Sequence, residues 1–221
     1  MADIATAPPH DARLQHHFDD PEQQREAATL GMWVFLATEL LFFGGLFAAY
    51  MIYRVWYPET FGDASRTLDI TLGSVNTLVL ITSSLTMAFA VRAASTGQRR
   101  QLLILLAVTM MLGLVFLGIK GVEYHQKFVE HHIPGFGFHF EGTAPERANL
   151  FFSLYFAMTG LHAAHMIIGL GLLTVMFVMA ARGRFSVAWH TPVELSGLYW
   201  HFVDIIWIFL FPLLYLVDRH K

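Results

Sequence analysis

Several ionisable side chains fall inside long apolar stretches of this 221-residue sequence, where they could hydrogen-bond, bind a cofactor or relay protons. Glu39 lies within GMWVFLATELLFFGG, near the middle of the first such stretch. An ionised carboxylate at membrane depth costs roughly 2.5 to 3.5 kcal/mol on insertion scales. We therefore expect Glu39 to be protonated or strongly hydrogen-bonded.

Histidines and carboxylates recur in the last two apolar stretches. His162 and His165 lie three residues apart in YFAMTGLHAAHMIIGLG, a spacing that places them on one face of a helix. Glu194, His201 and Asp204 follow in VELSGLYWHFVDIIW, at intervals that place them along one helical stripe. From this spacing we expect His201 and Asp204 to hydrogen-bond to each other.

The second and third apolar stretches also carry polar groups. Lys120 and Glu123, in GIKGVEYHQ, are three residues apart and can form an ion pair near the outer membrane surface. The second stretch has a polar edge of the kind that joins helices by hydrogen bonds. Its members are Asn76, Thr82, Ser83, Ser84 and Thr86.

Three interpretations of these groups remain open from residue types alone. The first is structural: the polar groups tie helices together and dock the bundle onto a larger partner. The second is a proton relay through the intramembrane residues, namely Glu39, His162, His165, His201 and Asp204. The third is a heme site, in which His162 and His201 supply one axial imidazole each from facing helices.

A longer connection, between the third and fourth apolar stretches, is rich in histidine around IPGFGFHFEG. Zinc or copper capture is one interpretation. The other interpretation is a loop that packs on a neighbour. We favour it because the spacing of the histidines fits no closed metal-ligand pattern. The histidines are His125, His131, His132 and His139.

The composition points to lipid as the surrounding solvent. The chain is 55% hydrophobic and 14% charged, whereas soluble domains are about 25% charged. A bilayer core of about 30 Å needs roughly 20 apolar residues per helix. Five stretches qualify: residues 30–53, 70–91, 102–122, 150–181 and 195–217. We predict an all-α polytopic membrane protein, a bundle of five transmembrane helices over 30–217, with polar tails at 1–29 and 218–221.

Charge and cysteine content exclude several functions. The net charge of −3 and the scattered basic residues exclude nucleic acid as a partner. The absence of cysteine excludes disulfides, thiolate zinc sites and a cysteine-bridged dinuclear copper centre. Arginines concentrate in the two short connections on the N-terminal side, which predicts a cytoplasmic N-terminus and an outer C-terminus. They are Arg92, Arg99, Arg100, Arg182 and Arg184.

Five segments of the chain together resemble subunit III of the heme-copper respiratory oxidases, the cytochrome c and quinol oxidases. They are HHFDDPEQQREAATLGMWVFLATELLFFGG, SVNTLVLITSSLTMAFA, GLVFLGIKGVEYHQ, FFSLYFAMTGLHAAHMIIG and YWHFVDIIWIFLFPLLYL. They occur in the family's order, from about Phe18 to the C-terminus, and LATELLFF, TGLHAAH and YWHFVD are the most specific pieces. Longer members have seven helices, and this chain is similar to their last five, as bacterial five-helix members are.

The resemblance implies a core subunit of a proton-pumping terminal oxidase in aerobic respiratory electron transport, in a bacterial inner membrane. Such a subunit has no catalytic residue, stabilises the catalytic subunit and supports proton uptake. Hemes and copper would lie on partner subunits I and II, none on this chain, and membrane phospholipid is a further candidate ligand. The resemblance implies structural or proton-environment roles for Glu39, Glu123, His162, His165, Glu194, His201 and Asp204.

Alternative functions are an accessory subunit of a nitric oxide reductase, an independent proton or solute transporter, and a b-type cytochrome. A transporter predicts inverted repeats and helices broken at the bilayer midplane. The sequence shows neither, although Gly44 and Gly45 interrupt the first apolar stretch. The electron donor, cytochrome c or quinol, is selected by other subunits.

Overall fold

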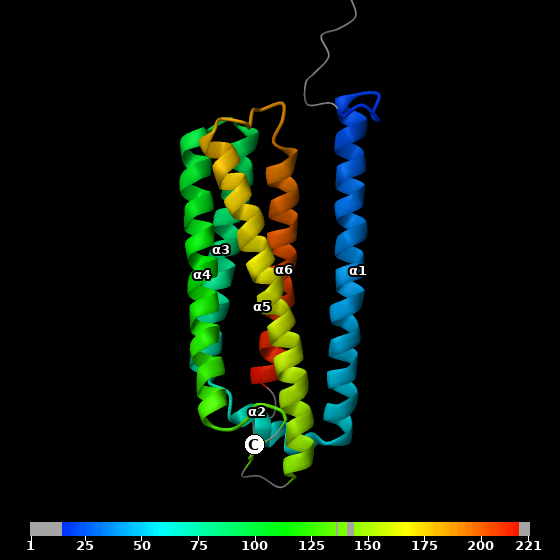
Figure 1. The fold of residues 1–221 in the computed structure, drawn as a ribbon, viewed down its shortest axis with the longest axis vertical. Helices are drawn as coiled ribbons and strands as arrows, with labels where there is room; N and C mark the ends of the chain where they lie inside the picture. The colour runs from blue at the N-terminus through cyan, green and yellow to red at the C-terminus, as the bar shows by residue number, and fades with distance from the viewer. Residues whose placement is uncertain (1–14, 136, 141–143, 217–221) are drawn as a thin grey trace, which may run out of the picture.

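A computed structural model describes residues 15–135, 137–140 and 144–216, and these residues are all-helical apart from their connections. Five long helices stand side by side along one axis, and a short one lies at one end (Figure 1). The helices are α1 Pro21–Trp56, α2 Pro58–Arg66, α3 Ile70–Ser95, α4 Arg99–Val129, α5 Pro145–Ala181 and α6 Thr191–Tyr215. The C-terminal tail, 218–221, and residues 1–14 of the N-terminal tail lie outside the described residues.

The five long helices are each long and apolar enough to cross a membrane, which confirms the predicted fold class. α1 and α5 have 36 and 37 residues and at 1.5 Å per residue exceed the hydrocarbon core. The start of α1 at Pro21 falls inside the polar N-terminal segment, because the Asp20 side chain accepts a hydrogen bond from the Gln23 backbone N–H at 2.7 Å. Hydropathy thus identifies the membrane-crossing part of a helix, whereas capping residues determine its ends.

The short helix α2 was not expected, because its segment reads as a polar connection between two spans. Pro58 begins it at a position where a missing backbone N–H costs nothing. Its apolar side is buried: Phe61 packs against Phe151 of α5, with ring centroids 5.4 Å apart. The Ser65 hydroxyl donates to the Leu214 carbonyl of α6 at 2.7 Å. α2 therefore closes this end of the bundle.

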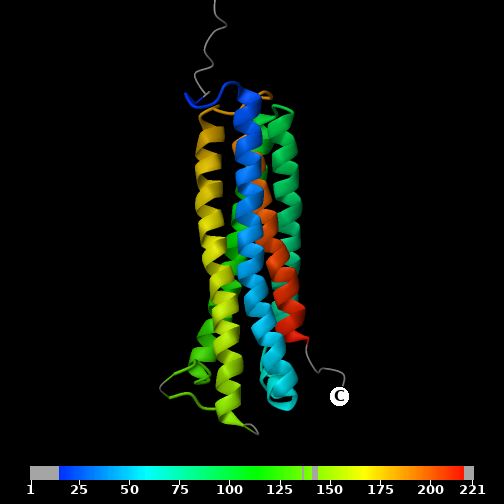
Figure 2. The same cartoon turned by 90° about the vertical axis from the view of Figure 1, so that its right-hand side faces the viewer.

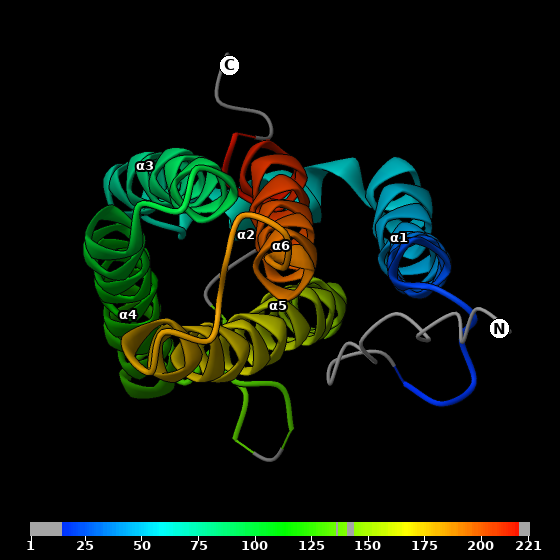
Figure 3. The same ribbon diagram turned by 90° about the horizontal axis from the view of Figure 1, so that it is seen from above.

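Seen along the axis, α3, α4, α5 and α6 surround a common interior, and α1 stands apart beside α5 and α6 (Figure 3). Trp200 of α6 fills part of that interior. A Cβ at Gly113 or Gly169 would lie 2.8 or 3.0 Å from its indole, so α4 and α5 need glycine where they meet this ring. The indole N–H donates to the Ser83 hydroxyl of α3 at 3.0 Å.

The polar edge of α3 joins it to α4, as the sequence predicts. The Asn76 amide donates to the Phe116 carbonyl, and the Ser83 hydroxyl to the Thr109 carbonyl, each at 3.3 Å. Two members differ: Ser84 contacts His201 of α6, and Thr82 is exposed and its hydroxyl bonds within α3. These interhelical bonds satisfy polar groups that lipid cannot.

The first described residues, the α3–α4 connection and the α5–α6 connection lie at the same end of the bundle (Figures 1 and 2). Arg99, in the first turn of α4, joins the two connections. Its Nε donates to the Ala180 carbonyl at 3.0 Å and its Nη2 to the Ala181 carbonyl, at the end of α5. A cation at these unpaired carbonyls also complements the helix dipole.

Candidate functional site

Five ionisable residues of the membrane spans lie near the middle of their helices. Glu39 is central in α1, His162 and His165 in α5, and His201 and Asp204 in α6. We call these the midspan residues. The structure does not bring them into one cluster; it divides them among a link from α1 to α5, the bundle interior, and the junction of α3 with α6.

The link from α1 to α5 is formed by Glu39 and His165. Glu39 Oε2 lies 3.1 Å from His165 Nε2, and His165 Nδ1 lies 2.9 Å from the Leu161 carbonyl oxygen. The side chains are only 20% and 14% exposed. Glu39 is therefore hydrogen-bonded to α5 through His165.

The hydrogen bonds of His165 define where protons can lie. A carbonyl oxygen only accepts, so Nδ1 must carry a proton to bond Leu161. Nε2 then either accepts from a protonated Glu39 or, as part of an imidazolium, donates to an ionised Glu39. Both arrangements contain the same single proton between the two side chains, and both are neutral overall. The pair can therefore share a proton without a net charge in the membrane.

His162 lies in a different environment from His165, although both point roughly the same way from α5. It is buried in the interior, with its ring 5.3 Å from that of Phe116 and 5.2 Å from that of Trp207. Neither ring nitrogen has a hydrogen-bond partner within the described chain. A three-residue offset rotates a side chain by about 60°, enough to turn one histidine toward α1 and the other toward the interior.

The junction of α3 with α6 contains His201 and Asp204. His201 Nδ1 lies 2.7 Å from the Ser84 hydroxyl oxygen of α3, and neither carboxyl oxygen of Asp204 has a partner within the described chain. The predicted hydrogen bond between His201 and Asp204 is therefore wrong, because the ring turns to a hydroxyl on the neighbouring helix. The proposed heme pair also does not fit, since His162 packs among aromatic rings while His201 faces α3.

Glu194 does not extend this stripe. It lies in the first turn of α6, where Oε1 is 3.1 Å from His190 Nε2. The α6 stripe therefore divides into a pair at the helix end and a separate midspan group.

Lys120 and Glu123 form the predicted ion pair, with Nζ 2.9 Å from Oε2 and both residues buried. Two tyrosines complete the site. Lys120 Nζ donates to the hydroxyls of Tyr155 and Tyr215 at 3.1 and 2.9 Å, and each hydroxyl donates to Glu123 Oε1. The cluster joins α4, α5 and α6. Sequence reasoning missed the tyrosines, although a hydroxyl inside an apolar span signals a need for a polar partner.

The histidine-rich connection packs against the chain itself. His132 stacks on Phe152 of α5, with ring centroids 4.8 Å apart, and its Nδ1 lies 3.0 Å from Glu130 Oε2. Burial, with the nearby Lys127 ammonium, lowers the pKa of His132 despite the Glu130 carboxylate. The described residues contain no group of three or more His, Cys, Asp or Glu placed to hold a metal ion.

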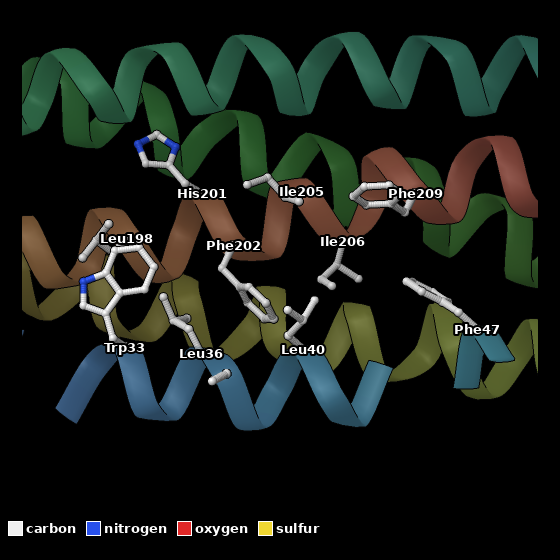
Figure 4. A pocket seen from close by; sticks show the side chains of 11 residues that line it. Trp33, Leu36, Leu40, Phe47, Leu198, His201, Phe202, Ile205, Ile206 and Phe209 are labelled. Atoms are coloured by element: carbon white, nitrogen blue, oxygen red, sulfur yellow. The ribbon is translucent and has the colours of Figure 1, made fainter. Parts of the chain in front are cut away.

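An apolar groove of about 600 Å³ separates α1 from α6 (Figure 4). His201 is the one ionisable residue on its walls, and the other labelled residues are hydrophobic. They are Trp33, Leu36, Leu40, Phe47, Leu198, Phe202, Ile205, Ile206 and Phe209. The groove suits apolar material.

The fold and these sites define a multi-pass membrane protein whose intramembrane polar groups mainly connect helices. The chain belongs to the cytochrome c oxidase subunit III family, whose model matches residues 16–218, and the resemblance seen in the sequence is confirmed. A member of this family is part of a complex with other oxidase subunits.

Relatives named as this subunit are similar to the chain over most of its length. It is 34% identical over 206 residues to cytochrome c oxidase subunit 3 of Thermostichus vulcanus, covering 91% of this chain and 92% of that one. The Bacillus subtilis subunit is 30% identical over 85% of each chain. The subunit of Gallus gallus is 30% identical over 84% of this chain and 67% of its own length.

Proposed function

We propose that this chain is a non-catalytic core subunit of a proton-pumping terminal oxidase, which stabilises the catalytic subunit and supports its proton uptake. The Glu39–His165 pair carries the proposal. It places a carboxyl group 3.1 Å from an imidazole midway along the membrane spans, on side chains that remain partly exposed. A carboxyl–imidazole contact at this depth is typical of proton-relay sites in membrane proteins.

The partners would be a catalytic subunit I with heme and copper, subunit II, and membrane phospholipid. Oxygen reduction would take place on subunit I, and this chain would supply packing and a proton environment through Glu39, Glu123, His162, His165, Glu194, His201 and Asp204. Its place would be a bacterial inner membrane, with the N-terminus in the cytoplasm. The arginine-rich connections at the N-terminal end support this orientation.

The transporter alternative is less well supported. It predicts helices interrupted at the bilayer midplane, whereas the described residues of all five spans form continuous helices through their midpoints. The relatives named above are all oxidase subunits.

Glu39→Gln tests the proposed role in the assembled oxidase. Gln keeps a hydrogen bond to His165 but removes the titratable proton, so we expect normal assembly and faster loss of activity during sustained turnover. Glu59→Gln is the control, because Glu59 is an exposed carboxylate in the first turn of α2 and its loss should leave persistence unchanged. A Glu39→Gln enzyme that fails to assemble, or that persists like wild type, would refute this role.

A further inference from the structure

A second groove, of about 300 Å³, lies between α3 and α6 and has an unusual polar floor. Ser84, His201 and Asp204 line it among otherwise hydrophobic residues. Asp204 is 2% exposed. The Ser84 hydroxyl lies close to this carboxyl and 2.7 Å from His201 Nδ1, yet neither carboxyl oxygen meets hydrogen-bond geometry with any group of the described chain.

A buried carboxyl without a partner is expensive, and most buried polar groups are satisfied. Asp204 is near the middle of α6 (Thr191–Tyr215), so the groove opens at mid-membrane depth. Acyl chains carry no hydrogen-bond donor, and lipid headgroups lie about 15 Å from the bilayer centre. A donor at this depth therefore does not come from lipid.

We propose that the α3–α6 groove docks a transmembrane helix of a partner subunit, which places a polar side chain against Asp204 and His201. This inference rests on the proposed function, because it takes the partner to be another subunit of the oxidase. The contact would supply the hydrogen bonds to Asp204 that the chain alone does not provide. It would also fix the position of the partner helix along an otherwise apolar interface.

The surface around the groove suits such a helix. Ile81 and Leu85 of α3 are 48% and 55% exposed, and Ile208 of α6 is 45% exposed. All three line the groove and offer an apolar surface beside its polar residues. Because Asp204 is itself buried, the incoming side chain must reach past this hydrophobic lining.

Photo-cross-linking in the intact membrane complex tests the interface. A photoreactive residue at Leu85 or Ile208 should attach to a transmembrane segment of a larger subunit, identified by mass spectrometry. The control is Met111 of α4, a hydrophobic residue with 62% exposure that lies outside the groove. Cross-links to lipid alone at Leu85 and Ile208 would overturn the proposal.

Asp204→Leu provides a second, independent readout. If Asp204 bonds a partner, the variant should release the larger subunit at least about five-fold faster in detergent, while the thermal stability of the separated chain is unchanged or higher. Asp204→Asn should restore retention, since an amide keeps hydrogen-bonding capacity. A separated Asp204→Leu chain that is less stable than wild type, with normal retention, would assign Asp204 a role within this chain and refute the docking site.

Two different measurements test the docking site and the proposed function. Cross-linking reports where a partner helix sits, whereas the heme spectrum of the complex reports what the partner is. A heme-copper subunit attached through another face would refute the docking site alone. A complex in which no subunit carries heme or copper would refute the proposed function and the oxidase partner inferred from it.

Discussion

Glu39 Oε2 lies 3.1 Å from His165 Nε2, and this contact joins the middle of α1 to the middle of α5. It matters because α1 buries few of its residues: Leu36, Phe43 and Tyr50 are the buried ones. Phe43 packs edge-on against His165, with ring centroids 5.3 Å apart. The pair therefore fastens a helix that otherwise has mostly apolar contacts with its neighbours.

A double-mutant cycle should measure this link. We expect Glu39→Leu and His165→Leu each to destabilise the folded chain by about 1 kcal/mol, the typical scale of a hydrogen bond between membrane helices. The double variant should lose less than the sum, because the second substitution removes no further bond. Reversible unfolding in mixed micelles gives the free energies. Strict additivity would show that the two side chains are not coupled.

Lys120→Met should be far more damaging, because it leaves the Glu123 carboxylate without its cation among buried side chains. Breaking one side of a buried ion pair costs about 3 to 5 kcal/mol. Adding Glu123→Gln should recover much of the loss, since a neutral amide oxygen still accepts from Tyr155 and Tyr215. Thermal unfolding of the purified chain would show both effects.

The control for that experiment is Asp63→Asn, which breaks the exposed pair with Arg66, 3.1 Å apart. Exposed pairs contribute about 0 to 1 kcal/mol, so the stability of this variant should stay close to wild type. Equal losses for Lys120→Met and Asp63→Asn would show that burial of the Lys120 cluster is unimportant.

The connection that contains His132 should loosen in acid. The pKa of the His132 imidazole is lowered in the folded state, from an ordinary value of 6.5, mainly by burial. The unfolded connection then binds more protons, so the packing is fully stable above about pH 6.5 and is weakened as pH falls below it. Amide hydrogen exchange, corrected for intrinsic rates, should rise around residues 131–140 toward pH 5. His132→Phe keeps the stack on Phe152 but not the proton, and should abolish this rise.

Membrane orientation can be tested with single cysteines, because the chain has none of its own. Gln98, in the α3–α4 connection, and Glu59, in α2, are both exposed and lie at opposite ends of the bundle. With a cytoplasmic N-terminus, an impermeant thiol reagent added outside intact cells should label Glu59→Cys and spare Gln98→Cys. The reverse pattern would invert the proposed topology.

The sequence predicted the features that depend on the order of residues within a single helix. Apolar length identified all five spans, and a three-residue spacing identified the Lys120–Glu123 pair. The same spacing misled for His201 and Asp204, because Ser84 on another helix competes for the ring. The partner of Glu39 is 126 residues away. No periodicity within one helix can reveal such a contact, since it depends on how α1 packs against α5.

One purification tests whether this chain is a cofactor-free subunit bound to an oxidase core. The complex should be isolated gently through this chain, its subunits and metals quantified, and the chain then separated for spectroscopy. We predict a larger subunit with heme and copper in the complex, and a separated chain without absorbance between about 400 and 600 nm, where hemes absorb. A stoichiometric heme on the separated chain, or a complex that lacks a heme-copper subunit, would contradict the account.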